Sequence, residues 1–190
     1  MKIDFAGAFY KKTEESSFKM KFVSGTKECV LLHFYNPMVI TLDGKQIETQ
    51  ANACILYRPG TPQIYWCKNN EFENDYIKFL PADMTFFNDF QIPFNEIFYV
   101  TNADIIRREM TDITYFLTER YENHDHELLD RLCKVLSNLQ NNRLYPSIKT
   151  KRESEIRFRL NQLRKKVSEN PEKWTVDLME DDFFLKRSHF

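Results

Sequence analysis

The side chains best able to do chemistry in this sequence are four histidines and four cysteines. One compact group of possible metal ligands occurs, formed by His124, Asp125, His126 and Glu127. On a helix, two histidines two residues apart point about 200° away from each other, so they cannot share one ion there. We therefore expect this group to begin a helix rather than to bind a metal.

No other group of residues has the pattern of a catalytic site. The sequence lacks the glycine-rich phosphate and dinucleotide motifs, the nucleophile elbow and the zinc motif HExxH. His33 lies in an apolar run, where a lone histidine is more often packed and hydrogen-bonded than a ligand. The acidic pair at 181–182 is explained by exposure to solvent. Nothing combines a nucleophile, a base and an orienting group, so we do not expect an enzyme.

Composition indicates a cytoplasmic globular protein. Hydrophobic residues make up 42% and charged residues 29% of the 190 residues, and Phe and Tyr are abundant (17 and 9). The longest apolar run, 29–32, is far shorter than the ~20 residues of a membrane helix, and no signal peptide is visible. The cysteines form no CxxC pair, which favours reduced thiols.

The first hundred residues have the pattern of a β-domain. Asp43-Gly44 separates two β-prone runs, 39–42 and 45–49, and predicts a type I′ hairpin. Further strand-like runs at 54–57, 64–67 and 76–79 are separated by turn signals, among them Arg58-Pro59-Gly60-Thr61-Pro62. Strands repeating about every ten residues predict a sandwich or barrel over residues 1–101.

After residue 101 the apolar period becomes that of a helix. Asn102 or Asp104 could cap a first helix, and Asp125 could open a second, which together form an antiparallel hairpin over 102–142. Each helix carries one apolar stripe, and the two stripes comprise Ile106, Met110, Ile113, Leu117, Leu129, Leu132, Leu136 and Leu139. These stripes could pair two copies of the chain in a homodimer, or could pack against the chain's own β-domain.

A polar linker is expected over 143–154, followed by a basic helix. Residues 149–166 contain eight Lys or Arg and only two Glu, which suggests a polyanion partner, although a solvated helix face gives the same pattern. Asn170-Pro171 ends this helix, and Thr175 is a possible N-cap of the next. An apolar stretch adjoins the last residue, so we expect the chain to be a fragment.

Two segments resemble the AraC family of transcription regulators. The turn at 58–65, with the preceding Asp-Gly hairpin and the following Tyr76-Ile77-Lys78-Phe79, resembles the family's cupin-like sensor domain. Residues 156–190, with Asn170-Pro171, Trp174-Thr175-Val176 and Ser188-His189-Phe190, resemble the start of its helix-turn-helix. The two resemblances occur in the family's order, on either side of the helical hairpin.

The resemblance implies an α+β chain: a cupin-like double-stranded β-helix (jelly roll), an antiparallel hairpin that dimerises, and an incomplete helix-turn-helix over 155–190. It implies a small-molecule effector in the barrel, a sugar or another metabolite, and Tyr65 and Tyr76 are its expected contacts, with Trp66 and His33 as further candidates; the tyrosines could equally be core residues. In the whole protein, the residues expected to contact operator DNA are Arg157, Arg164, Lys165, Lys166, Lys186, Arg187 and Ser188.

We expect neither a metal nor another cofactor in the barrel. Gln63 stands where metal-binding cupins usually carry a histidine, and one histidine, His33, cannot form a metal site. Two alternatives remain open. One is a metal-free cupin that acts alone, as a small-molecule binder or an isomerase-like enzyme, and the other is a dimerisation scaffold without a pocket.

Overall fold

The computed structural model describes residues 2–15, 17–67, 72–101, 103–119, 124–144, 167, 171–175 and 178. The chain forms two compact units, Met1–Leu144 and Tyr145–Phe190, which are described separately. In the part of the chain that is described, no helix combines the length and apolar character needed to cross a membrane.

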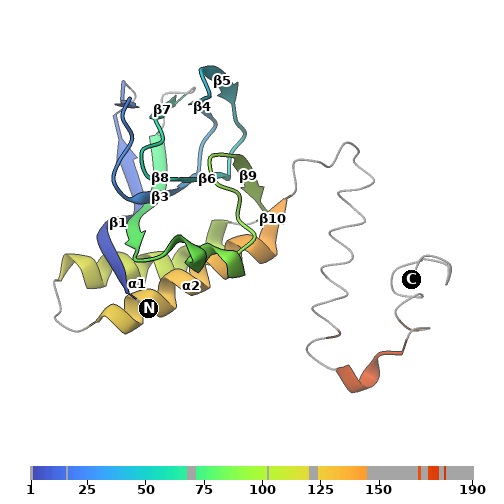
Figure 1. Cartoon of the computed structure of the whole chain (residues 1–190). Helices are drawn as coiled ribbons and strands as arrows, with labels where there is room; N and C mark the ends of the chain where they lie inside the picture. Colours follow the sequence, from blue (N-terminus) through green and yellow to red (C-terminus); the bar gives the residue numbers. More distant parts are fainter. Residues whose placement is uncertain are drawn as a thin grey trace. The chain divides into compact units, whose positions relative to one another are not determined.

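The first unit contains two antiparallel sheets (Figure 1). The larger sheet has the order β1-β8-β3-β6-β9-β10 and the smaller has the order β2-β7-β4-β5. The strands are β1 (Ile3–Glu14), β2 (Lys19–Phe22), β3 (Cys29–Phe34), β4 (Met38–Leu42), β5 (Lys45–Glu48), β6 (Ala53–Tyr57), β7 (Gln63–Cys67), β8 (Phe72–Pro81), β9 (Ile97–Val100) and β10 (Arg143–Leu144).

The order of the first eight strands is that of a jelly roll. The pairs β1–β8, β2–β7, β3–β6 and β4–β5 are those of one long antiparallel hairpin, rolled so that alternate pairs fall in different sheets. The predicted α+β fold class with a jelly roll is therefore confirmed.

The predicted turns are present and have the expected backbone. Asp43 and Gly44 both have positive φ, 48° and 75°, as a type I′ turn between β4 and β5 requires. Gly60 also has positive φ, 76°, and the Thr61 N–H closes the turn on the Arg58 carbonyl at 3.1 Å. These turns fix the register of the strands that follow them.

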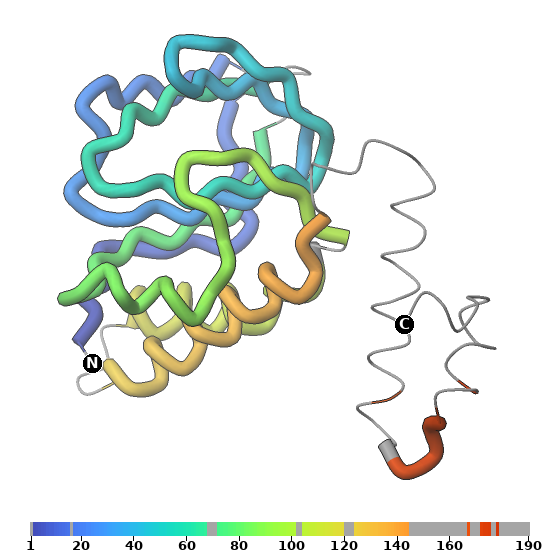
Figure 2. Tube along the Cα trace, turned by 45° about the vertical axis from the view of Figure 1, so that its right-hand side comes forward, coloured from blue at the N-terminus to red at the C-terminus, as the bar shows by residue number. Residues whose placement is uncertain are grey.

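A helical hairpin covers the outer face of the six-stranded sheet (Figures 1 and 2). A 3-10 turn, η2 (Ala103–Ile106), leads into α1 (Arg107–Thr118), and α2 (Asp125–Asn142) follows. The second helix begins at Asp125 as predicted, whereas the α-helical part of the first begins at Arg107, later than the predicted caps. The helices run antiparallel, since Asn138 of α2 bonds to the carbonyl of Ile105.

The two faces of the six-stranded sheet bury separate hydrophobic clusters. One cluster lies between the sheet and the helices, together with η1 (Met84–Asp89), and the other fills the interior of the roll. Alternation along β3 shows the division, because Leu31 belongs to the helix-side cluster and Leu32 to the interior cluster. Below, these are called the helix side and the interior side of the sheet.

The end of α2 is joined to the larger sheet. Arg143 and Leu144 form β10, which pairs with Val100 and Tyr99 of β9. The Thr101 N–H also donates to the carbonyl of Asn142. The first unit therefore includes two residues that the sequence assigned to the linker, and they hold the last turn of α2 against the sheet.

In the second unit, one predicted feature lies on described residues. The N–H of Leu178 donates to the Thr175 hydroxyl at 3.3 Å, which is the bond an N-cap makes to the third helical residue. Pro171 begins a short 3-10 turn, η3 (Pro171–Lys173). The predicted cap at Thr175 is thus confirmed.

Candidate functional site

Two of the four residues expected to contact an effector line one cavity inside the roll. Tyr65 lies on β7 and Tyr76 on β8, so they come from different sheets. Along β7 the inward positions alternate, so that Gln63 and Tyr65 both face the cavity. Along β8 every second residue from Phe72 to Lys78 lines it. The cavity has a volume of about 90 Å³.

Aromatic rings form much of the cavity wall. The rings of Tyr65 and Phe72 are stacked, with centroids 6.1 Å apart and planes inclined by 12°. Phe18 packs on Phe72 at 4.7 Å, and Phe34 meets the edge of Tyr65 at 5.2 Å. Such rings give a rigid, flat apolar surface to a bound molecule.

The hydroxyl of Tyr65 is held protonated. Burial, and then the Glu14 carboxylate and the Tyr76 hydroxyl, raise the pKa of Tyr65 well above its ordinary value. At neutral pH this hydroxyl is therefore a neutral group that can both donate and accept a hydrogen bond. Glu14, Tyr65 and Tyr76 all line the cavity.

Charged side chains surround Tyr76. Lys12 and Glu14 of β1 form an ion pair and both line the cavity. The ammonium groups of Lys12 and Lys78 lie 5.9 Å and 5.6 Å from the centroid of the Tyr76 ring. The cavity thus combines an aromatic interior with cationic groups at one of its walls.

The other two expected contacts do not face this cavity. Trp66 follows Tyr65 on β7 and points to the opposite side, where the Lys19 ammonium lies 4.2 Å from its ring centroid. His33 lies between Leu32 and Phe34, which face the interior, and therefore points to the helix side. Both expectations are corrected by strand alternation.

His33 belongs to a buried polar network on the helix side. Its Nδ1 lies 2.9 Å from Oδ2 of Asp75, and both residues are 1% exposed. The Tyr35 hydroxyl and the Lys11 N–H also donate to this carboxylate, at 3.0 Å and 2.7 Å. Burial, and then the Asp75 carboxylate, raise the pKa of Tyr35. The network is a hydrogen-bonded part of the core.

The same network explains an irregularity in β1. The register of β1 on β8 shifts between Phe9 and Lys12, and Lys11 has a positive φ of 54°. This bulge turns the Lys11 N–H toward Asp75 and brings Lys12 and Glu14 onto the cavity side. No pattern in the sequence indicates this bulge, so Lys12 and Glu14 are not among the predicted site residues.

The apolar stripes of the helical hairpin are mostly buried within the protomer. Six of the eight residues expected at a dimer interface are at most 1% exposed and pack in the helix-side cluster: Ile106, Met110, Ile113, Leu132, Leu136 and Leu139. Leu117 and Leu129 are half-buried. The expected interface is corrected for those six, because the hairpin packs against its own sheet, the alternative that the sequence left open.

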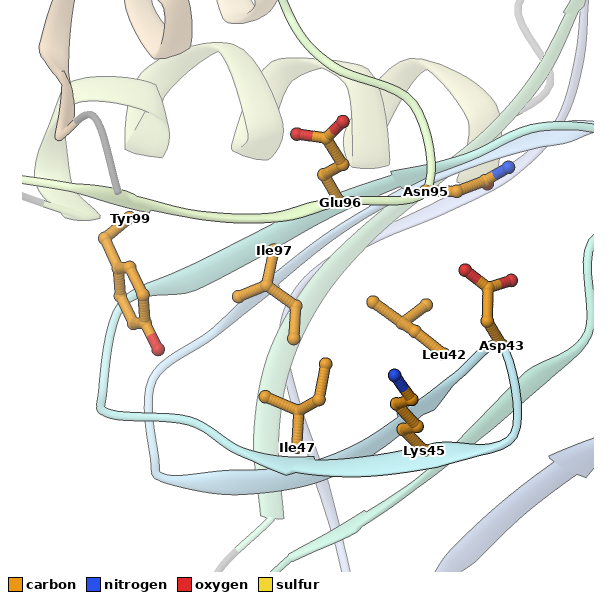
Figure 3. Close-up of a pocket in the computed structure, with 8 residues that line it drawn as sticks. All are labelled: Leu42, Asp43, Lys45, Ile47, Asn95, Glu96, Ile97 and Tyr99. Carbon is orange, nitrogen blue, oxygen red and sulfur yellow. The ribbon is translucent and has the colours of Figure 1, made fainter. Parts of the chain in front are cut away.

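A second hollow lies beside the β4–β5 turn (Figure 3). It is a groove of about 460 Å³, in which Leu42, Ile47 and Ile97 point toward one another and the Glu96 carboxylate points away. Its wall also includes Tyr99, whose hydroxyl accepts a hydrogen bond from the Gln50 N–H at 3.3 Å. The residues lining it are exposed or half-buried.

Metal binding has no support in the part of the chain that is described, where no three His, Cys, Asp or Glu side chains are grouped to hold an ion. Gln63 instead donates from Nε2 to the Thr26 hydroxyl at 3.2 Å and lines the cavity. All seven residues expected to contact DNA, and the whole basic segment 149–166, lie outside the described residues.

No model of a protein family matches the chain, and no curated protein matches it. Among solved structures, ToxT from Vibrio cholerae has a TM-score of 0.41 and 8% identity, over 99% of this chain and 73% of ToxT. ToxT from Vibrio cholerae O395 bound to (E)-4-(8-methylnaphthalen-1-yl)but-3-enoic acid has a TM-score of 0.41 and 9% identity over the same shares.

The AraC-like transcriptional activator CuxR has a TM-score of 0.34 and 10% identity, over 86% of this chain and 59% of CuxR. At these TM-scores the function of the chain has to be inferred from its own residues.

Proposed function

We propose that the chain is the sensing and dimerising part of an AraC-type transcription regulator that responds to a small molecule. The observation that carries this proposal is the convergence of Tyr65 and Tyr76 on one cavity of a jelly roll that also carries a helical hairpin. A molecule in the cavity contacts strands of both sheets.

A path from the cavity to the hairpin is available along β8. Tyr76 faces the cavity, whereas its neighbour Ile77 packs in the helix-side cluster with residues of α1 and α2. A ligand that prefers one position of β8 therefore also prefers one position of the hairpin. Such unequal binding to two arrangements is all that allosteric control requires.

A thermal-shift screen of metabolites tests effector binding. A ligand present at 100 times its Kd stabilises the fold by about 2.7 kcal/mol, which is easily measured. Tyr65→Phe and Tyr76→Phe keep the rings but remove the hydroxyls, and we expect at least one of them to weaken binding by about tenfold. If both leave the affinity of a ligand unchanged, this cavity is not the effector site.

Tyr99→Phe is the matched control. It removes the hydroxyl of a tyrosine that lines the groove in Figure 3 rather than the cavity. We expect this variant to bind the same ligand with unchanged affinity. Weaker binding in Tyr99→Phe alone would move the site to the groove.

We further propose that two chains pair through the outer surface of the hairpin. Leu117 and Leu129 are the two members of the apolar stripes that stay partly exposed, and Tyr115 beside them is 52% exposed. Leu129→Glu should give a folded monomer in analytical ultracentrifugation, because a charge at a half-buried position opposes association more than folding. An unchanged dimer mass in this variant would reject the interface.

Sequence-specific DNA binding is proposed for an AraC-type regulator that contains this chain, with a recognition helix that begins near Lys186 or Arg187. For the 190 residues themselves we propose only non-specific binding. The basic residues of 149–166 can contact phosphates, which gives weak, salt-sensitive and sequence-blind binding. A gel-shift titration at about 150 mM salt tests this, and more than tenfold preference for one sequence would contradict it.

A further inference from the structure

The outer face of the four-stranded sheet, which points away from the interior of the roll, is apolar at its centre. Tyr65 of β7 points inward, so its neighbours on that strand point outward. The residues of β7 and of its partner β4 on this outer face are Ile64, Trp66, Val39 and Thr41. An antiparallel sheet with one face in water normally carries polar residues there. These two strands instead have the pattern of strands that are covered on both faces.

Charged and amide side chains flank this apolar centre on the two outer strands. β2, at one edge, contributes Lys19 and Lys21, and β5, at the other edge, contributes Gln46 and Glu48. All four are exposed. The Lys19 ammonium lies 4.2 Å from the centroid of the Trp66 ring, which holds this charge at the border of the apolar centre. An apolar centre that contains an aromatic ring and has a polar rim is typical of a protein–protein interface.

Strand register arranges the outer sheet face in two rows. Across the strands β2, β7, β4 and β5, the first row is Lys19, Trp66, Val39 and Glu48, and the second is Lys21, Ile64, Thr41 and Gln46. Each row therefore begins with a lysine and continues with a large apolar side chain, then a smaller one, then a side chain with acceptor oxygens. The helices α1 and α2 lie on the other sheet, away from this face (Figure 1).

We propose that the outer sheet face binds a second copy of the chain, with the two four-stranded sheets packed face to face. A two-fold axis parallel to the strands sets the β2 edge of one copy against the β5 edge of the other. Lys19 then faces Glu48 of the second copy, and the Trp66 ring faces the smaller Val39. A two-fold axis across the strands would set lysines against lysines, so the charges favour the first arrangement.

The size of the outer sheet face predicts weak association. It extends about 19 Å across its four strands and about 13 Å along four residues of each. This is at the small end of specific interfaces, so we expect a larger Kd than for pairing through the hairpin. The inference goes beyond the proposed function, because it requires neither an effector nor DNA. Two different two-fold surfaces on one chain build assemblies larger than a dimer.

The test is sedimentation velocity of the whole chain with Leu129→Glu, which removes the pairing proposed for the hairpin. We expect a monomer at low micromolar concentration and a reversible dimer at several hundred micromolar. Lys19→Glu sets carboxylates against each other across the two-fold axis and should weaken this dimer at least tenfold. Glu48→Lys should do the same, and the double variant Lys19→Glu/Glu48→Lys should restore the dimer.

Lys45→Glu is the matched control. It changes the net charge by the same amount as Lys19→Glu, but Lys45 is an exposed residue of β5 whose side chain lies on the groove side of the sheet (Figure 3). We expect this variant to associate as strongly as its parent. Trp66→Gln removes the central ring and should weaken the dimer about tenfold.

Each contrary result overturns the proposal. If the Leu129→Glu chain stays monomeric at the highest concentration, the outer sheet face does not pair copies, while the proposed function stands. If Lys19→Glu and Lys45→Glu act equally, or the double variant does not restore the dimer, association uses another surface. If Leu129→Glu does not fold, the same variants are compared in the unsubstituted chain. There Lys19→Glu should remove the species larger than a dimer, and their persistence would contradict the proposal.

Discussion

Asn74 and Asp75 are neighbours on β8, are equally buried, and face opposite sides of the sheet. On the helix side, the Asp75 carboxylate receives hydrogen bonds from His33, Tyr35 and the Lys11 N–H. On the interior side, Asn74 Oδ1 and the buried hydroxyl of Tyr57 have no partner among the described residues. One side of the sheet is a completed core, and the other has polar groups that a bound molecule could satisfy.

The largest expected effect concerns the helix side. Leu132 is fully buried between α2 and the sheet, so Leu132→Glu places a charge in the core without a partner. We expect this variant not to fold, measured by circular dichroism and urea titration. Leu129→Glu is the matched control on the same helix and should stay folded, because Leu129 is half-buried. A folded, monomeric Leu132→Glu would show that the hairpin does not pack on the sheet.

The same substitution at the two neighbours compares the sides directly. Asp75→Leu removes the acceptor of the buried His33 ring, of the Tyr35 hydroxyl and of the Lys11 N–H, and we expect it to lower the free energy of unfolding by about 3–5 kcal/mol. Asn74→Leu removes an unpaired acceptor and should change that free energy by less than about 1 kcal/mol. Urea denaturation measures both. Equal losses would mean that the interior side is as complete as the helix side.

Local patterns in the sequence predicted most of the fold. The turns at Asp43-Gly44 and at Gly60 require positive φ, and alternation around them defined β4 to β8. The helical hairpin followed from its apolar period. What the stripes cover could not be predicted, because Leu132 has the same pattern whether it packs on a sheet or on a second chain.

The candidate site was predicted only in part, for two physical reasons. Strand alternation alone places Trp66 on the opposite face of β7 from Tyr65, which is sufficient to exclude Trp66 from the cavity. The same alternation places Lys78 on the cavity face of β8 with Tyr76. Lys12 was not predictable, because the β-bulge at Lys11 changes which side the rest of β1 faces. At that bulge the Lys11 N–H bonds to Asp75, which is 64 residues away in sequence.

Alkaline pH should destabilise the helix side before the interior side. Burial raises the pKa of Cys29 to about 11 from 9.0 and that of Cys54 in the same direction, and both lie in the helix-side cluster. The unfolded chain then loses its thiol protons first, so stability is constant below about pH 9 and falls as the pH rises toward 11. Tyr57 and Tyr65 on the interior side, whose pKa burial also raises, follow from about pH 10.

The midpoints of urea unfolding, measured between pH 7 and pH 11, test this order. The cysteines come first because the ordinary pKa of a cysteine is lower than that of a tyrosine. Cys29→Ala should lower stability slightly at neutral pH but make the decline between pH 9 and pH 10 less steep. A decline of the same steepness in this variant would show that the Cys29 thiol does not contribute to it.

The smallest effect is the order in which the cysteines react with a thiol reagent. Cys133 of α2 is half-buried, while Cys29 and Cys54 are fully buried beneath the hairpin. Burial, and then Asp130, raise the pKa of Cys133, so we expect it to react more slowly than a free cysteine but before the other three. Mass spectrometry of partially labelled protein identifies the site. Labelling of Cys29 or Cys54 before Cys133 would mean that the hairpin opens from the sheet more readily than a completed core allows, and it would weaken the contrast between the two sides.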